Sequence, residues 1–229
     1  MVNIDLWIDR SDFFNYKNYL YFWSLLNTLE RVKAQRFVRE PDRRRYVAAH
    51  GKLRRILATY LRIPPDTIAL ATHEHGKPFI VGDERHGIKF NMAHSGDFLL
   101  VGVSSGYDIG VDIEVWSDSV DYEAVLDLCF ADAERYFWNT LPVEQRQAFF
   151  YRLWTRKESF VKAVGLGLGL DVAQVVTAPG GPSRFLSLPS GCGEPGDWSL
   201  TDLELATGLS GALTISGGDC LANITYKRL

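Results

Sequence analysis

The spacing of hydrophobic residues changes several times along the chain, and each change predicts a different element. From Asn3 to Ile8 apolar and polar residues alternate, which places Ile4, Leu6 and Ile8 on one face and is typical of a strand. Between 41 and 61 the apolar residues follow helical spacing instead. The sequence therefore predicts a mixture of strands and helices.

Extending this reasoning along the chain gives a full set of expected elements. Helices are expected at 13–29, 41–61, 121–128, 132–138 and 143–164, the last ending at Gly165. Strands are expected at 3–8, 68–72, 88–92, 98–104, 109–115, 173–177, 198–205, 211–216 and 221–226. The strands 98–104 and 109–115 are expected to form a hairpin, and the glycine- and proline-rich stretch 179–196 an exposed loop.

The order of the elements repeats along the chain. Strand, helices and strands follow one another before about Gly106 and again after it, without a clear repeat in the sequence itself. We therefore expect an α+β fold with two lobes, residues 1–105 and 106–229. A cleft between two lobes is a common place for a ligand.

Composition narrows the class of protein. The 229 residues are 46% hydrophobic and 23% charged, with a net charge of −3, which is ordinary for a globular protein and gives no general attraction to nucleic acid or anionic membranes. Three widely separated cysteines favour neither a disulfide framework nor a zinc site. The first ten residues do not resemble a signal peptide, and no apolar run is long enough to span a bilayer. These features favour a cytoplasmic protein.

The segment 109–114 carries the sharpest chemical pattern. On a strand Asp112 and Glu114 project to one face, while Val111 and Ile113 face the other way. Adjacent carboxylates repel unless a cation lies between them, and Mg²⁺ prefers such oxygen ligands. The plainer interpretation, a solvated acidic strand end, stays open, but the apolar flanks favour a strand inside a sheet.

A third carboxylate lies on the long helix expected at 143–164. Trp154, Glu158 and Lys162 share one face of that helix. Glu158 and Lys162 form either an ordinary surface ion pair or, together with the DxE strand, a site for a metal and a phosphate.

Basic residues crowd the first half of the chain although the whole chain is acidic, so a local anion site is expected there. Lys77 follows Gly76 in a rigid turn, and His94 lies at a strand end, where a structural histidine is the plainer interpretation. The basic cluster comprises Lys33, Arg36, Arg39, Arg43, Arg44, Arg45, Lys52, Arg54 and Arg55.

Several segments occur together in one order that resembles a known family. They are RRRYVAAHGKLRRIL (43–57), GKPF (76–79), FNMAHSG (90–96), IGVDIE (109–114) and LWTRKESFVKAVGLGL (153–168). The chain resembles the 4′-phosphopantetheinyl transferases of the larger, surfactin-synthetase-activating type. The resemblance implies two similar α+β lobes related by a pseudo-twofold axis, with the active site in the cleft between them.

The resemblance also implies roles for individual residues. The Mg²⁺ ligands would be Asp112, Glu114 and Glu158, with Mn²⁺ as a substitute ion. Residues that contact coenzyme A would be Lys33, Arg45, Lys77, His94 and Lys162. The base that activates the acceptor serine would be Glu158, or Glu134 through a water, and the sequence does not choose between them.

The implied reaction moves the 4′-phosphopantetheine group of coenzyme A to a serine of an apo carrier protein and releases 3′,5′-ADP. The carrier is expected to be an acyl, polyketide or peptidyl carrier that docks on a monomer near Phe130 and Tyr136, whose plainer interpretation is core packing. Ala93 stands where many family members have serine, and Glu30 stands where the family can have a second upstream lysine. We expect these departures to weaken contacts to coenzyme A and its phosphates. Two alternatives stay open: another Mg²⁺-dependent phosphoryl transferase, and a binding module without turnover.

Overall fold

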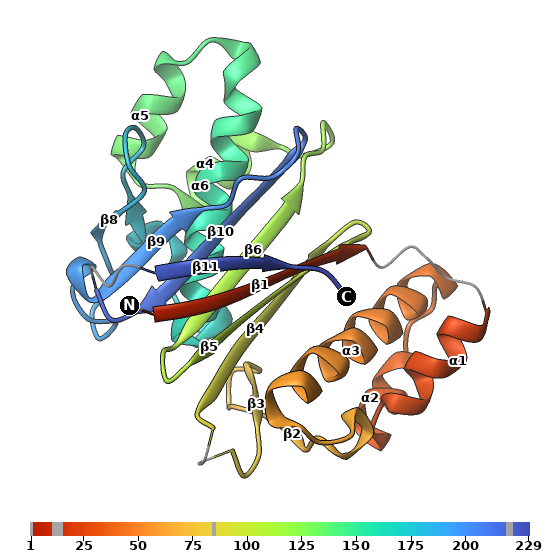
Figure 1. Ribbon diagram of the computed structural model, residues 1–229. Helices are drawn as coiled ribbons and strands as arrows, with labels where there is room; N and C mark the ends of the chain where they lie inside the picture. Colours follow the sequence, from red (N-terminus) through yellow and green to blue (C-terminus); the bar gives the residue numbers. More distant parts are fainter. Residues whose placement is uncertain (1, 11–15, 84–85, 219–221) are drawn as a thin grey trace.

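The computed structural model describes residues 2–10, 16–83, 86–218 and 222–229 and confirms an α+β fold (Figure 1). The helices are α1 (Tyr16–Leu25), α2 (Thr28–Gln35), α3 (Glu40–Leu61), α4 (Tyr122–Cys129), α5 (Asp132–Thr140) and α6 (Val143–Val164). The strands are β1 (Val2–Arg10), β2 (Leu70–Thr72), β3 (Pro78–Ile80), β4 (Ile88–Ser95), β5 (Phe98–Ser105), β6 (Ile109–Val115), β7 (Val176–Thr177), β8 (Phe185–Ser187), β9 (Trp198–Asp202), β10 (Leu209–Ser216) and β11 (Ala222–Lys227). Among the described helices, none combines the length and the apolar character that crossing a membrane requires.

Two sheets and two long helices form the body of the protein. One sheet has the strand order β11-β1-β5-β4 and the other β6-β10-β9. Buried side chains of both sheets share one core, α3 packs on the outer face of the first sheet, and α6 packs on the outer face of the second. Helix, sheet, sheet and helix thus form successive layers, and each half of the chain contributes one 22-residue helix on one sheet.

The sheets meet where edge strand β4 lies beside edge strand β6. The side chain of Asn91 accepts a hydrogen bond from the backbone N–H of Val111 at 2.9 Å, and Ser95 Oγ accepts one from the N–H of Val115 at 3.0 Å. These contacts join the two halves of the chain along what we call the β4–β6 seam. Figure 1 shows α1–α3 gathered at one end of the molecule and α4, α5 and part of α6 at the other.

The expected hairpin between 98–104 and 109–115 is wrong. Strand β5 pairs with β1 on one side and β4 on the other, so it has no free edge for β6. The chain instead carries β6 into the second sheet, where it pairs with β10. Gly110 lets α6 lie directly on β6, because a Cβ at that position would stand 1.9 Å from the carbonyl oxygen of Ser159.

The last strand returns to the beginning of the chain. Strand β11 pairs parallel with β1 and completes the first sheet. Residues 222–227 therefore belong structurally with the N-terminal sheet, and the division into lobes at 105 and 106 stays a prediction. The expected strand 221–226 begins at a residue outside the described part.

Three other expectations need correction. The strand expected at 173–177 is reduced to β7, because residues 172–174 form a short 3-10 helix. The helix expected at 13–29 is broken into α1 and α2, because the side chain of Asn27 caps α2 by accepting from the N–H of Glu30 at 2.8 Å; residues 11–15 lie outside the described part. The stretch 179–196 is not simply an exposed loop, because Phe185 and Cys192 are buried against α6.

Helices α3 and α6 match their predictions closely. Helix α3 begins one residue earlier than expected and has proline in its first turn, and α6 has the predicted bounds. Gly165 ends α6 in the left-handed conformation with φ of 79°, which costs glycine little.

Candidate active site

Two cavities open near the β4–β6 seam between the long helices. The larger, which we call the central cavity, has a volume of about 340 Å³ and is lined from both halves of the chain, with His75, Lys77 and Asn91 from the first and Glu158, Lys162 and Gly167 from the second. The other, which we call the α3 cavity, has a volume of about 300 Å³. Its lining includes Phe37, Arg45, Tyr46 and His94.

Asp112 is the most deeply buried acid of the site. Its side chain projects from β6 toward α6, and the residue is 2% exposed. The ammonium of Lys162 donates to Oδ1 at 2.5 Å, while Oδ2 is buried without a hydrogen-bond partner. The pKa of Asp112 is raised to about 7, mainly by burial; Lys162 opposes this shift, and the charges of Glu114 and Glu158 contribute to it.

The other two predicted metal ligands lie in the same electrostatic environment. Glu114 accepts a hydrogen bond from Ser95 Oγ at 2.6 Å across the seam. Burial raises the pKa of Glu158, Glu114 adds to this shift, and Lys162 opposes it. Asp112 from β6 and Glu158 from α6 thus share the ammonium of Lys162, and Glu114 lies close enough to act on both carboxylates.

The donor chemistry of these residues suits a metal ion, but their arrangement does not form a complete site. Within the described part of the chain, no group of three His, Cys, Asp or Glu side chains is arranged to hold a metal, and Lys162 supplies the positive charge at Asp112. The chemistry of the donors does suit a hard cation, because Asp112 has a buried oxygen without a partner beside two further carboxylates. The shared metal site therefore stays a prediction.

His94 and Arg45 both line the α3 cavity, and Arg45 supplies positive charge there. Desolvation by the surrounding protein lowers the pKa of His94, and Lys162 and His50 lower it further. Arg45, on α3, pairs with Asp97 at 3.0 Å and with Asp42 at 3.2 Å. Lys162, which lines the central cavity, therefore lies close enough to His94 at the α3 cavity to act on its charge.

Lys33 does not line the α3 cavity itself but contacts a residue that does. Its ammonium lies 5.6 Å from the ring centroid of Tyr46, and the tyrosine lines the α3 cavity. Sequence reasoning did not single out Tyr46, although it lies next to Arg45 on the same helix.

Lys77 borders the central cavity, but its charge does not point into open space. Its ammonium donates to the backbone oxygen of Ala163 at 2.6 Å and to that of Ile109 at 3.2 Å. Burial lowers the pKa of Lys77 to about 8; Asp108 opposes this shift and Lys89 adds to it.

Glu134 is not brought to the site. It is fully buried, pairs with the equally buried Lys157 at 2.8 Å, and accepts hydrogen bonds from the N–H of Ala131 and from the N–H and hydroxyl of Thr177. It lines neither the central nor the α3 cavity. Glu134 therefore holds α5 to α6 and β7. Its contacts do not support the sequence-based interpretation of Glu134 as a base.

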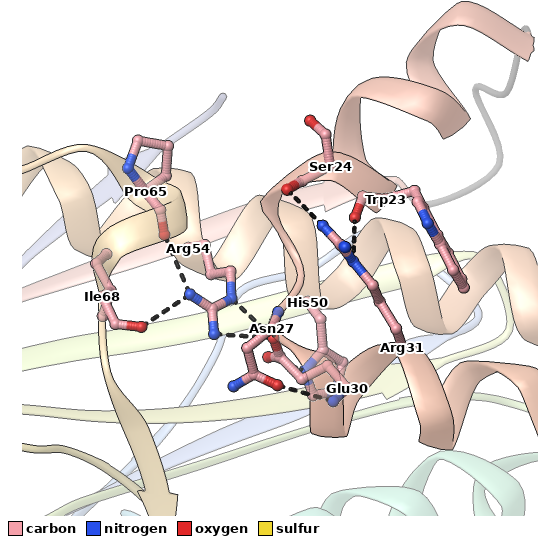
Figure 2. Close-up of polar contacts among 9 residues, drawn as sticks. All are labelled: Trp23, Ser24, Asn27, Glu30, Arg31, His50, Arg54, Pro65 and Ile68. Atoms are coloured by element: carbon pink, nitrogen blue, oxygen red, sulfur yellow. Dashed lines mark hydrogen bonds and ion pairs between the residues drawn. The ribbon is translucent and has the colours of Figure 1, made fainter.

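Glu30, expected to weaken phosphate binding, is instead the centre of a buried polar network (Figure 2). Its Oε2 accepts from Arg54 Nε at 2.9 Å and from the N–H of Asn27 at 2.9 Å, and its Oε1 lies 3.1 Å from His50 Nδ1. Burial would raise the pKa of Glu30, but these hydrogen bonds and the charge of Arg54 together lower it. Glu30 thus fixes α2, which carries Lys33, against α3.

Arg54 has a structural role, although sequence reasoning treated it only as part of the basic cluster expected to bind an anion. It is fully buried, and its guanidinium also donates to the carbonyls of Pro65 and Ile68 at 3.1 and 2.9 Å (Figure 2). The sequence contained a sign of this burial. Arg54 lies seven residues from both Val47 and Leu61, so helical spacing places it on their buried face of α3.

The two residues named for carrier docking have different surroundings. Phe130 is 3% exposed and stacks on Phe150 inside the cluster between α4, α5 and α6, so its plainer interpretation as core holds. Tyr136 is 74% exposed on α5 and is available to a partner.

The site thus combines paired acids with nearby basic residues at the junction of two sheets, an arrangement that suits an anionic ligand bound together with a cation. Comparison with known proteins agrees with it. Residues 108–210 match the 4′-phosphopantetheinyl transferase superfamily, and residues 15–105 match the N-terminal region of 4′-phosphopantetheinyl transferases.

Individual relatives agree as well. The chain is 32% identical over 195 residues to the 4′-phosphopantetheinyl transferase HetI of Nostoc, covering 84% of this chain and 79% of the relative. It is 32% identical to a putative 4′-phosphopantetheinyl transferase of Synechocystis, over 80% of this chain and 74% of the relative. The L-aminoadipate-semialdehyde dehydrogenase-phosphopantetheinyl transferase of Xenopus laevis is 30% identical, over 64% of this chain and 51% of its own length. The chain belongs to the 4′-phosphopantetheinyl transferase superfamily and is a transferase.

Proposed function

We propose that the protein transfers 4′-phosphopantetheine from coenzyme A to a serine of an apo carrier protein, with release of 3′,5′-ADP, and that it is of the surfactin-synthetase-activating type. The observation that carries the proposal is the convergence of Asp112, Glu114 and Glu158 with Lys162 and His94 at the β4–β6 seam. Matches to both an N-terminal and a C-terminal family region support two lobes within one chain, so that a monomer holds both walls of the site.

The chain's own residues divide the work of phosphoryl transfer, which depends mainly on positioning and charge neutralisation. Lys162 offsets the negative charge that develops on the leaving 3′,5′-ADP, and His94 donates a hydrogen bond to it from a ring N–H. Arg45 binds a phosphate in the α3 cavity, and Lys33 adds positive charge behind Tyr46. Asp112, Glu114 and Glu158 would hold a magnesium ion, which neutralises diphosphate oxygens when bound.

Glu158 is the proposed base. It lines the central cavity, and its pKa is raised, so it accepts a proton more readily near neutral pH than an ordinary glutamate. It would take the hydroxyl proton of the carrier serine, which is a poor nucleophile while protonated.

A single assay tests this function and its alternatives. The protein is incubated with coenzyme A, Mg²⁺ and an apo carrier, and the carrier is weighed by mass spectrometry. A phosphopantetheine mass gain is expected. An unmodified carrier with hydrolysed coenzyme A would indicate a hydrolase, and binding without product would indicate a binding module; either result contradicts the proposal.

A further inference from the structure

Lys77 makes a polar contact between the two halves of the chain. It lies in the turn between β2 and β3, but its ammonium donates to Ala163 in the last turn of α6 and to Ile109 at the start of β6. The last carbonyls of a helix lack partners within the helix, and a cation is favoured there. The lysine therefore caps the end of α6 from the other half.

Two glycines make room for this turn beside the end of α6. A Cβ at Gly165 would stand 2.9 Å from Cδ of Lys77, and a Cβ at Gly167 would stand 3.2 Å from the carbonyl oxygen of His75. The turn is closed by a hydrogen bond from the N–H of His73 to the Lys77 oxygen at 2.9 Å. Gly165 thus packs against the side chain of Lys77, and Gly167 packs against the backbone of the turn.

This packed junction forms one wall of the central cavity. His75, Lys77, Gly165 and Gly167 all line the cavity. Lys77 and Gly165 also line a separate cavity of about 210 Å³ on the far side, so the same residues separate the two spaces. The position of this wall depends on the lysine, because its ammonium holds both β6 and α6.

We infer that Lys77 is a positioning residue that fixes the wall of the central cavity between the two halves, and that it does not bind a phosphate of coenzyme A. This inference rests on the proposed function. A lysine that neutralises phosphate presents its ammonium to the ligand, whereas the Lys77 ammonium is held by two backbone carbonyls across the junction.

The test measures the affinity for coenzyme A by calorimetry over a range of salt concentrations. Lys77→Met keeps the apolar stem and removes the ammonium, and Arg45→Met is the matched control at a proposed phosphate contact. Lys77→Met is expected to weaken binding about tenfold by the same factor at every salt concentration. Arg45→Met is expected to weaken binding and also to make it less dependent on salt.

Two further variants test the role of Lys77. Lys77→Arg, which preserves a phosphate-binding charge, is expected not to restore affinity, because the space beside Gly165 is closed to a larger group. Gly165→Ala, which leaves the lysine charge in place, is expected to reproduce the uniform loss; these two variants decide the matter if Lys77→Met does not fold. Three outcomes would overturn the inference about Lys77: normal affinity of Lys77→Met for coenzyme A, a weaker salt dependence of its binding, or restored affinity in Lys77→Arg.

The turnover assay separates this inference from the proposed function. Lys77→Met is expected to raise the KM for coenzyme A with little change in kcat, whereas a residue needed only for folding would lower Tm and leave KM unchanged. If the wild-type protein modifies no carrier, the proposed function fails; if it does and Lys77→Met behaves like the wild type, only the role of Lys77 fails.

Discussion

The ammonium of Lys162 lies 2.5 Å from Oδ1 of Asp112, and the other oxygen of that carboxylate is buried without a partner. One turn of α6 away, Glu158 acts on the same aspartate with a like charge. The acid centre therefore has more carboxylates than the single ammonium of Lys162 can neutralise. This imbalance gives it the capacity to accept a further cation, and it makes Asp112 the first residue to test.

Asp112→Asn is expected to abolish transfer while leaving the fold intact. The substitution keeps the shape of the side chain but removes the charge that a cation requires. Because burial disfavours that charge, Tm in metal-free buffer is expected to stay at or above the wild-type value. Near-normal turnover in a folded Asp112→Asn protein would exclude the proposed metal role.

Lys162→Ala is expected to lower kcat about a hundredfold with a smaller effect on the KM for coenzyme A. The reason is that the ammonium offsets charge that is greatest in the transition state, and losing one such group costs on the order of 10²–10³ in rate. Steady-state kinetics with a saturating carrier measure this. Unchanged kinetics would reduce Lys162 to a simple partner of Asp112.

The chain pattern predicted those parts of the site that depend on local periodicity. Strand alternation correctly placed Asp112 and Glu114 on one face, and helical spacing with Gly165 gave α6 its bounds. In the structure β6 packs on α6, because Gly110 allows the two backbones to approach closely. Periodicity alone does not reveal this contact.

The missed features all depend on partners far away in the sequence. A hairpin after β5 looked natural locally, but β1 already occupies the edge that β6 would need. Glu134 and Glu30 both lie where a functional residue was considered, yet Lys157 and Arg54 neutralise them inside the protein. A single sequence gives the charge of a residue, whereas burial by a distant partner decides whether that charge reaches a ligand.

The stability contributed by Lys77 is expected to rise with pH between about 8 and 10.5. Its pKa is lowered to about 8 in the folded protein from a usual value of 10.5, so in this range the unfolded chain binds more protons. Stability therefore increases with pH here. Thermal unfolding of the wild type and Lys77→Met at several pH values measures the difference in Tm, which is expected to shift in favour of the wild type as pH rises; a constant difference would contradict the lowered pKa.

Glu134→Gln is expected to damage stability rather than chemistry. It leaves the buried Lys157 without its charged partner, and breaking a buried ion pair in this way costs about 3–5 kcal/mol. Denaturant unfolding gives the free energy, and activity is expressed per folded molecule. A stable Glu134→Gln protein without activity would instead restore Glu134 as a base.

Glu30→Lys introduces the residue type whose absence was expected to weaken phosphate binding, and it is expected to fail as a gain of function. In the structure the new ammonium would face Arg54 in a buried network, so α2 would separate from α3 and Lys33 would lose its position beside Tyr46. Tm is expected to fall by several degrees, and the affinity for coenzyme A to fall with it. Glu30→Gln is the control, because it keeps the hydrogen-bonding shape and is expected to lose less. Tighter binding of coenzyme A by Glu30→Lys would mean that position 30 faces the phosphates after all.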